Sequence, residues 1–457
     1  MPTTPCIPNL TIPSPFKLPT ALTFDAPTIS SDGGALLLRQ IDDRLGLCAQ
    51  VAALIPDHRD ASRVTHSRVE QIRQRAFQIA LGYEDCNDAN TLRRDSVLKL
   101  ACDRLPNDPK GLSSQPSLSR MEHAPSARDV VLIQWALERS YVEDLPTDTT
   151  QVVLDVDSTD DPTHGQQPLS YFNAHYDIWM YFPVLVFDGE GRLVTARLRP
   201  GNAGGHRYTT PMLERVIRLL KGRFPQLQIF VRGDGGFCAP RLMKCLEALD
   251  DEFGDIDYAL GVPQNKVLLR HPTMVNASKI AEAQFPETRS PTRVFAQFDY
   301  AAGTWPHERR IIAKAEHLEK GPNPRFVVTS MREFDPRLIY ERVYCARGQA
   351  ENWIKDFKRA LRAERLSCTT YVANAFRLML HALAYRLMHT LRTALAAHAP
   401  GLSTAQFDTI RLRLLKVAAV VTQSVRRIVV ALPRSFPLAA AFRGLAATLG
   451  AAHGMAA

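Results

Sequence analysis

Apolar residues recur at helical spacing through the first third of the chain. The segments ALLLRQIDDRLGL and VEQIRQRAFQIAL place apolar side chains three and four positions apart, which is typical of amphipathic helices. A polar, proline-bearing stretch, YVEDLPTDTT, ends this pattern near residue 147. We therefore expect an N-terminal helical region over residues 1–148, in which about the first 30 residues form a proline-rich, irregular arm.

The pattern then changes to short strands. We expect strands at VVLDVDST, MYFPVLVFD and RLVTARLRP, with GEGR as a hairpin turn between the last two. Amphipathic helices at TPMLERVIRLLKGRF and APRLMKCLEALDD alternate with strands at QIFVRGD and DYALGV. The order β-β-β-α-β-α-β predicts a protein of the α/β class, with a mixed sheet covered by helices.

A β-rich insertion and a second helical region follow. Strand-like alternation in VFAQFDYAAGTWPHERRIIAKAEHL and PRFVVTSM predicts a β-strand insertion at residues 262–335. It divides the α/β core into a first part, residues 149–261, and a second part, residues 336–365, which carries a helix from Arg347. We expect helices to continue through IRLRLLKVAAVVTQSVRRIVVAL in a basic C-terminal region, residues 366–457, with a frayed tail.

The charge of the chain is concentrated in this C-terminal region. The 457 residues carry a formal net charge of +9. The segment from Leu366 to the end holds ten Lys or Arg residues and a single acid, Asp408, so it accounts for the whole excess. A basic tract on a neutral body favours a polyanionic partner such as nucleic acid, while ordinary surface arginines on helices are an equal alternative.

Cysteine usage and hydropathy indicate a cytosolic setting. The eight cysteines are scattered and form no C-x-x-C pair, so we expect reduced thiols rather than a zinc ribbon or a disulfide scaffold. The N-terminus lacks the basic start and apolar run of a signal peptide. No uncharged stretch of about 18 apolar residues predicts a membrane span. We expect a cytoplasmic protein with no membrane partner.

Two acidic residues lie where predicted strands end. Asp157 closes VVLDVDST, and Asp234 closes FVRGD before two glycines. Sites in α/β sheets form at the carboxyl ends of strands, and carboxylates there suit hard ions such as Mg²⁺. The alternative is that each acid is a turn or cap residue. Asp155, Asp160 and Asp161 compete with Asp157, since Asp155 shares its strand face.

A third acid lies in the segment YCARGQAENWIKDFK. On a helix, Glu351 shares one face with three cations, because the four residues fall at i, i+4, i+8 and i+11: Arg347, Glu351, Lys355 and Lys358. The three positive charges exceed the single negative charge of this glutamate, and phosphate oxygens nearby would balance them. Its alternative role is a helical ion pair with Arg347 and Lys355. His164 and His175, in the polar loop after Asp157, are candidates for approach to metal or DNA, although solvated loop histidines are the commoner case.

The same residues carry a resemblance to a known family. Tyr344, Arg347, Glu351 and Lys358 have the spacing Y-x(2)-R-x(3)-E-x(6)-K, which resembles the signature of a large group of bacterial insertion-sequence transposases with DDE chemistry. D-S-T at Asp157 is similar to the first-Asp motif of that group, and RGDGGF around Asp234 is similar to its second, R-x-D-x-x-F. LDVDSTDDPTHGQQ, ALGYEDCNDANTLRRD and LSSQPSLSRMEH resemble one subgroup, and the resemblance spans roughly residues 30 to 430.

This resemblance implies a ribonuclease H-like core in which Asp157, Asp234 and Glu351 are catalytic and hold Mg²⁺ or Mn²⁺, with two ions expected. It also implies that Arg347 and Lys358 contact phosphates or strand ends, with Lys355 beside them, and that Tyr344 is a positioning group. Trp305, in the insertion, is implied as a base-stacking residue; its alternative is a place in the insertion core.

The implied function is transposition. The partners would be double-stranded DNA at transposon ends and targets, bound partly by the N-terminal helices, and a second copy of the chain in a DNA-bound dimer. The enzyme would work in the bacterial cytoplasm on nucleoid DNA. Water would attack first and free a 3′-hydroxyl, which would then attack target DNA. A nuclease that only hydrolyses and a non-catalytic DNA-binding protein on the same scaffold are the alternatives.

Overall fold

The computed structural model describes residues 10–12, 20–23, 25–288 and 290–451. Much of the expected N-terminal arm, including Cys6, and the end of the expected frayed tail lie outside these residues. Within the arm, β1 (Leu10–Ile12) pairs with β2 (Thr20–Leu22) as an antiparallel ribbon.

A nine-stranded mixed sheet is the centre of the molecule. Its outer strand β14 (Gly321–Pro322) pairs only with β13. The other strands lie in the spatial order β12 (Thr292–Tyr300), β13 (Arg309–Leu318), β15 (Arg325–Thr329), β11 (Ile256–Val262), β10 (Gln228–Gly233), β4 (Gln151–Ser158), β8 (Val184–Asp188) and β9 (Leu193–Arg197).

Three central strands of this sheet are parallel. β4, β10 and β11 run in one direction, whereas β8 is antiparallel to β4 and β9 is antiparallel to β8. Gly233 of β10 lies opposite Val156 of β4 and Leu260 of β11. The carboxyl ends of these strands therefore meet at one edge of the sheet, which confirms the predicted mixed sheet and its strand-end geometry.

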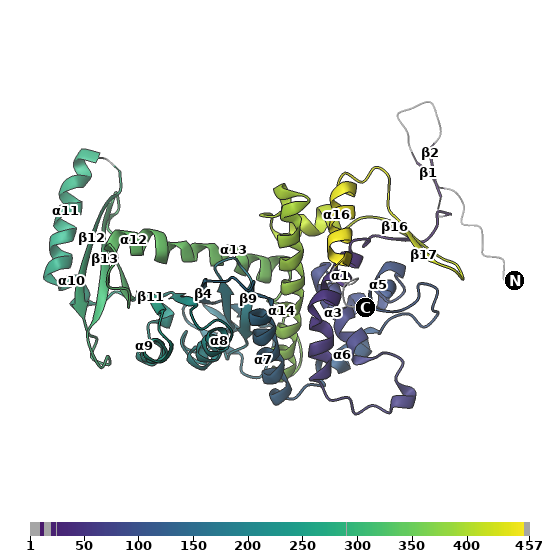
Figure 1. Cartoon of the computed structure of the whole chain (residues 1–457), viewed down its shortest axis with the longest axis horizontal. Helices are drawn as coiled ribbons and strands as arrows, with labels where there is room; N and C mark the ends of the chain where they lie inside the picture. Colours follow the sequence, from purple (N-terminus) through teal and green to yellow (C-terminus); the bar gives the residue numbers. More distant parts are fainter. Residues whose placement is uncertain (1–9, 13–19, 24, 289, 452–457) are drawn as a thin grey trace.

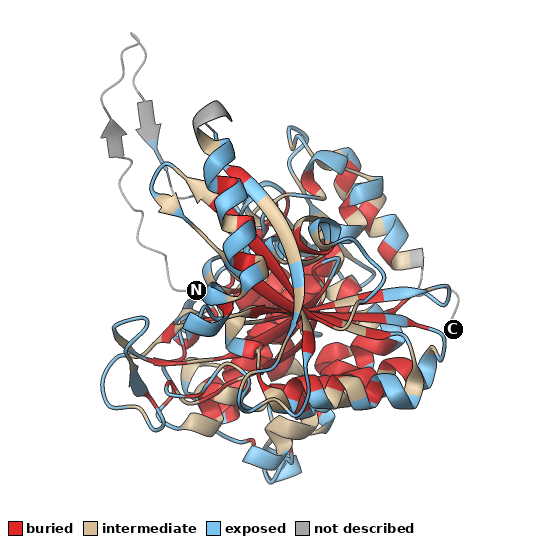
Figure 2. Cartoon of the chain, turned by 90° about the vertical axis from the view of Figure 1, so that its left-hand side faces the viewer, coloured by how far each residue is buried: buried red, intermediate tan, exposed pale blue. Residues whose placement is uncertain are grey.

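Helices cover both faces of the sheet (Figures 1 and 2). Alternation along the strands directs residues such as Leu154 and Val186 towards α8 (Thr209–Arg223) and α9 (Pro240–Phe253). The opposite face carries Phe187, whose ring contacts Trp353 and Tyr385. None of the helices in the described part of the chain is long and apolar enough to cross a bilayer.

The predicted N-terminal helices are present. They are α1 (Ala35–Leu45), α2 (Leu47–Ala53), α3 (Arg68–Ala80), α4 (Ala89–Leu92), α5 (Ser96–Ala101), α6 (Gln115–Glu122) and α7 (Ala127–Asp144). The long helix α14 (Tyr371–Ala394) packs against α1, α3, α7 and β9. One apolar core consequently runs from the N-terminal helices through α14 to the sheet.

The insertion contains helices as well as the expected strands. α10 (Lys266–Arg270) and α11 (Pro272–Thr288) precede β12, and α11 packs on β12 and β13. The buried side of α11 includes Met274, Ala277 and Ala281. One methionine and two alanines at this spacing give a weak apolar signal, which explains why a purely β-rich segment was the expectation here.

The prediction of an all-helical C-terminal region is wrong. After α15 (Phe407–Ile410), the chain forms a hairpin of β16 (Ala419–Gln423) and β17 (Ile428–Ala431). α16 (Ala439–Ala451) then follows where a frayed tail was expected. β16 also pairs with β3 (Ile29–Ser30) near the other end of the chain. The apolar spacing of this Val- and Ile-rich segment is compatible with a helix and with a strand. Its pairing with the distant strand β3 favours the sheet.

Candidate active site

Asp157 and Asp234 lie at the ends of neighbouring parallel strands. Asp157 is the penultimate residue of β4, and Asp234 directly follows Gly233, the last residue of β10. The Asp234 carboxylate accepts a hydrogen bond from the Gly236 amide at 2.9 Å, which caps the single turn after the strand. The turn role considered for Asp234 is thus real, and it holds the carboxylate at the edge of the sheet.

The structure separates the four acids that compete near the end of β4. Asp155 is fully buried and accepts two bonds of 2.6 Å from Arg232. Asp160 accepts a bond from Lys358 at 2.7 Å. Both carboxylate oxygens of Asp161 are buried and have no hydrogen-bond partner among the described residues, and burial raises the pKa of Asp161 well above its usual range. Asp157 is left as the acid that faces Asp234.

The segment bearing the sequence signature is a helical stretch over residues 336–360. It begins with α12 (Pro336–Leu338) and includes α13 (Gln349–Lys355), and its other turns are of the π and 3-10 types. Figure 1 shows α12 and α13 lying across the sheet. Such π turns inside helices often occur at functional sites, because they redirect side chains locally.

Two cations of this stretch reach the acids at the end of β4. Arg347 donates to Asp157 Oδ2 at 3.0 Å, and Lys358 donates to Asp160 Oδ1 at 2.7 Å. The helical stretch therefore docks on the same strand end that carries Asp157. In this conformation both cations are paired with protein acids.

A buried arginine also fixes the helical stretch to the strands. Arg232 of β10, besides pairing with Asp155, donates to the carbonyl oxygen of Val343 at 2.9 Å. The next residue, Tyr344, directs its hydroxyl at Gly261 of β11, where the Cβ atom of any other residue would lie only 2.6 Å from the Tyr344 oxygen. Glycine is therefore required at position 261 for this close approach.

Asp157 is the electrostatic centre of the group. Burial raises the pKa of Asp157 to about 6, Arg347 opposes the rise, and Asp234 and Glu351 add to it by repulsion. The negative charges of Asp234 and Glu351 thus act on the Asp157 carboxylate at the strand ends. The oxygen donors of these three carboxylates match the ligand preference of Mg²⁺ and Mn²⁺, so the chemistry of the donor set fits such an ion.

Glu351 and Lys355 are both exposed on α13. Within the described residues neither forms an ion pair, so the alternative helical ion pair of Glu351 with Arg347 and Lys355 is absent. The same part of the chain contains no group of three His, Cys, Asp or Glu side chains close enough to hold one ion. The two strand-end aspartates converge, and Glu351 interacts with Asp157 electrostatically without joining it in a closed cage.

Trp305 lies in the connection between β12 and β13, half-buried against the core of the insertion. Its ring contacts Tyr300 at a centroid distance of 5.6 Å, and the Arg309 guanidinium lies 5.4 Å from the ring centroid. Arg309 in turn pairs with Glu247 of α9 at 2.6 Å. These contacts correspond to the core alternative considered for Trp305.

Sequence reasoning missed Arg199, which organises the loops around the strand ends. Arg199 is fully buried, and burial lowers its pKa to about 10. It donates to Ser158 Oγ at 2.7 Å and to several backbone carbonyls, including that of Gly205. A Cβ at Gly205 would lie 2.6 Å from the Gly236 carbonyl oxygen, so this glycine-rich loop packs directly on the Asp234 turn. In the sequence, the clustered glycines of PGNAGGHR are the feature that could have indicated this closely packed loop.

An aromatic hairpin also lies near the acids. It comprises β6 (Tyr171–Asn173) and β7 (Ile178–Tyr181), and β7 pairs with β5 (Asp161–Pro162). Phe172 and Trp179 are 48% and 59% exposed. Burial raises the pKa of Tyr176, in the turn of this hairpin, and the charges of Asp160, Asp157 and Asp234 raise it further. His164 and His175 are exposed in the same region.

Half of the C-terminal cations bind acids or backbone carbonyls of the protein itself. Among those with internal partners, Arg386 pairs with Asp144, Arg392 pairs with Asp356 at 2.6 Å, and Lys416 pairs with Asp32 at 2.6 Å. Arg377 and Arg411 bind backbone carbonyls of Glu84 and Ala80. The remaining five are exposed: Arg413, Arg426, Arg427, Arg434 and Arg443. Charge count alone therefore overstated the free basic surface of this region.

Comparison with known proteins gives a family for the chain. A cryo-EM structure of a piggyBac transposase synaptic complex with hairpin DNA is similar at a TM-score of 0.42 and 10% identity, over 84% of this chain and 80% of that one. The comparison with curated proteins found no match. The sequence model of the family described as transposase DDE domain group 1 matches residues 15–453, nearly the full length, and the chain therefore belongs to this transposase family.

Proposed function

We propose that the chain is a DNA transposase with a ribonuclease H-like catalytic core. It would bind the ends of an insertion sequence, cleave the phosphodiester bond and join the freed 3′-hydroxyl to target DNA. The observation that carries this proposal is the meeting of Asp157 and Asp234 at adjacent parallel strand ends, beneath a helical stretch that bears Arg347 and Glu351. Membership of the DDE transposase family supports it.

The topology of the sheet supports the proposed core. β9, β8, β4, β10 and β11 are consecutive neighbours, and β8 alone runs opposite to the other four. Along the chain, β4 is the first strand of this sheet and β10 is the fourth, and they carry Asp157 and Asp234 as a ribonuclease H-like arrangement requires. The later helical stretch supplies Glu351.

In this proposal Asp157, Asp234 and Glu351 hold Mg²⁺ or Mn²⁺, with two ions expected. Such ions, when bound, supply activation of the attacking oxygen and stabilisation of the leaving oxygen. Arg347, Lys355 and Lys358 bring positive charge to the same edge, where a phosphodiester would lie. Tyr344, whose hydroxyl approaches Gly261 and whose neighbour Val343 is bonded to Arg232, would position Arg347.

Alanine substitution of each acid tests the proposal. We expect Asp157→Ala, Asp234→Ala and Glu351→Ala to abolish cleavage of transposon-end DNA in Mg²⁺ while duplex binding in chelator is retained. Asp251→Ala, which removes an exposed acid of α9, is the matched control and should cleave normally. Full cleavage by a folded Asp234→Ala protein would refute the assignment.

A pre-cut substrate separates transposition from the two alternatives. With a recessed 3′-hydroxyl end and target DNA, we expect joined products, whereas a nuclease that only hydrolyses yields none. A protein that binds DNA, takes up no metal and cuts nothing would instead be the non-catalytic alternative.

Light scattering of the DNA complex tests the proposed homodimer, and Trp305→Ala tests the base-stacking role that the family resemblance implies for Trp305.

A further inference from the structure

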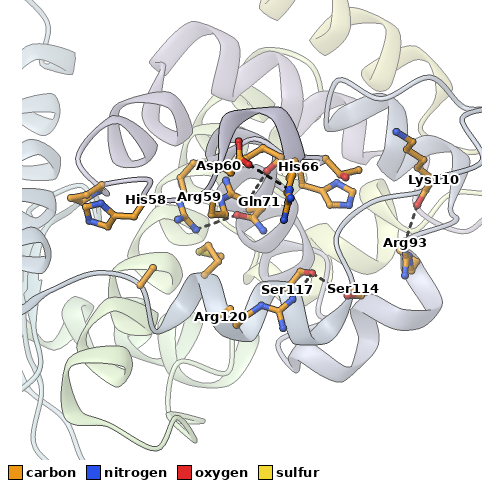
Figure 3. A pocket seen from close by; sticks show the side chains of 17 residues that line it. His58, Arg59, Asp60, His66, Gln71, Arg93, Lys110, Ser114, Ser117 and Arg120 are labelled. Atoms are coloured by element: carbon orange, nitrogen blue, oxygen red, sulfur yellow. Dashed lines mark hydrogen bonds and ion pairs between the residues drawn. The ribbon is translucent and has the colours of Figure 1, made fainter.

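A wide basic cleft lies in the N-terminal helical region, apart from the acids of the sheet. Its cavity volume is about 930 Å³ (Figure 3). The first turns of α3 and α6 line it, together with the connection before α3 and the residues around Lys110. Nothing in the proposed chemistry uses this cleft.

The lining of the cleft is strongly unbalanced in charge. Asp60 is its one acidic residue, and His58 and His66 are also present. The cationic side chains that line it are Arg59, Arg63, Arg68, Arg93, Lys110 and Arg120. An excess of this size in one concave surface attracts anions from a distance and retains them.

Several of these cations lack an acidic partner. Arg93 bonds only to the carbonyl oxygen of Lys110, at 3.0 Å, and Arg120 bonds only to Ser117 Oγ, at 3.4 Å, among the residues that the structure describes. Lys110 forms no ion pair in that same part of the chain. Their charges are therefore available to a ligand in the cleft (Figure 3).

Arg68 gives a second and independent indication of a ligand. Its side chain is only 10% exposed, yet its Nε atom is buried without a hydrogen-bond partner among the described residues. The nearest acid, Asp57, lies 3.5 Å from the guanidinium and is shared with Arg59. Nη1 of Arg68 already donates to Gln71 Oε1 at 3.2 Å, so Nε is the unsatisfied donor. Such a donor costs free energy that a rearrangement of the guanidinium around an anion in the cleft would recover.

Backbone dipoles add to this positive potential. α3 begins at Arg68 and α6 begins at Gln115, and residues of both first turns line the cleft. The amino ends of helices carry a partial positive charge and favour phosphate groups. Two such ends, together with the cations, therefore act in the same direction.

The basic surface continues onto the C-terminal hairpin. The Asn107 amide donates to Gln423 Oε1 of β16 at 3.1 Å, which holds the hairpin beside the loop that carries Lys110. The turn of this hairpin exposes Arg426 and Arg427. Cations are thus present both in the cleft and at the turn of the adjacent hairpin, and such a spread suits a polymer of phosphates better than a single small anion.

We propose that this cleft binds the sugar-phosphate backbone of duplex DNA. The inference rests on the proposed function, because it takes DNA as the substrate, but it assigns a separate contact surface. Backbone contacts of this kind position DNA without reading its sequence. The cleft would hold a stretch of duplex while the strand-end acids act on another part of the same molecule.

The test compares two triple variants of the full chain by fluorescence anisotropy with labelled duplex in chelator, over a range of salt. The cleft variant is Arg93→Gln, Lys110→Gln and Arg120→Gln. The matched control removes the same charge from exposed cations elsewhere: Arg139→Gln, Arg241→Gln and Lys244→Gln. We expect the log–log salt slope to fall by about 2–3 in the cleft variant, since each phosphate that is no longer neutralised lowers it by about 0.9. The decrease in affinity should be equal on unrelated sequences.

Equal slopes for the wild type and the cleft variant would overturn the proposal, as would a wild type that does not bind duplex. If the triple variant misfolds, Lys110→Gln with Arg120→Gln, both exposed, replaces it. Inorganic phosphate is the second probe: phosphate binding abolished in the cleft variant with duplex affinity intact would assign the cleft to a small anion instead. Because binding is read without metal, failure here is distinct from failure of the cleavage test.

Discussion

Asp155 and Asp157 differ in role although they share a residue type and a strand. Both lie on one face of β4, since side chains alternate with a period of two, and the sequence therefore left them equivalent. The difference between them is Arg232, which is 77 residues away and neutralises Asp155 from the neighbouring strand. The motifs around Asp157 and Asp234 indicated two strand ends that are neighbours in the structure, whereas the pairing that makes Asp155 structural depends on register between distant strands.

The close approach of Tyr344 to Gly261 leads to a prediction at the same scale. Gly261→Ala places a Cβ atom 2.6 Å from the Tyr344 hydroxyl and in tight contact with the turn at Asp234. We therefore expect the free energy of unfolding to fall by about 1–3 kcal/mol. In a Tyr344→Phe background, which lacks that hydroxyl, the same substitution should cost less. A urea-unfolding double-mutant cycle measures the coupling. Identical costs in both backgrounds would show that the hydroxyl does not set the requirement for glycine.

Among the elements, the helix from Arg347 was predictable, although the helical stretch already begins at Pro336, and the C-terminal hairpin was not. The signature residues required a helix, and Arg347 and Lys358 do reach the same strand end. The segment that became β16 and β17 has apolar residues compatible with either period. Its decisive contact is with β3, about 390 residues earlier in the chain, which no local pattern reveals.

The hairpin predicts the sign of a stability change. Thr422 and Val429 are exposed cross-strand partners, so replacing both with alanine should lower the free energy of unfolding by about 1 kcal/mol. In a helix the same change would raise stability, because alanine is the better helix former. Chemical denaturation of the double variant measures the sign. Asn276→Ala, at an exposed position of α11, is the control and should be stabilising.

Across the whole molecule, the N-terminal and C-terminal regions form one body. Buried residues from α1, α3, α14 and α16 belong to a single apolar core. Buried charged residues also connect these helices. Glu122 of α6 pairs with Arg75 of α3 at 2.6 Å and lies near Arg377 of α14. The sequence located α1, α3 and α14 but not α16, which lies where a frayed tail was expected. It did not reveal how these helices associate, because the basic C-terminal tract has the pattern of free surface until its buried partners are known.

This buried network predicts the response of the molecule to acid. Burial by itself would raise the pKa of Glu122, but Arg75 and Arg377 lower it from 4.5 to about 2. A lowered carboxyl pKa stabilises the folded state above the unfolded value of 4.5, and that stabilisation is lost as the pH falls towards 2. Glu122→Gln should therefore cost up to about 3 kcal/mol at neutral pH and progressively less in acid.

Urea unfolding of the wild type and of Glu122→Gln across this pH range measures the effect. The two curves of stability against pH should converge at the acidic end. Parallel curves would mean that Glu122 is not ionised in the folded protein. Glu143→Gln, at an exposed position of α7, provides the control for the loss of one carboxylate.

The pairing of β3 with β16 has a consequence for how the protein is made. A ribosome releases the chain from its first residue onwards, and most domains fold as they emerge. Here the earliest helices cannot complete their packing until α14, the hairpin and α16 have been synthesised, because those late segments supply part of their core. We therefore expect the basic cleft to reach its final form only after these late segments have been synthesised.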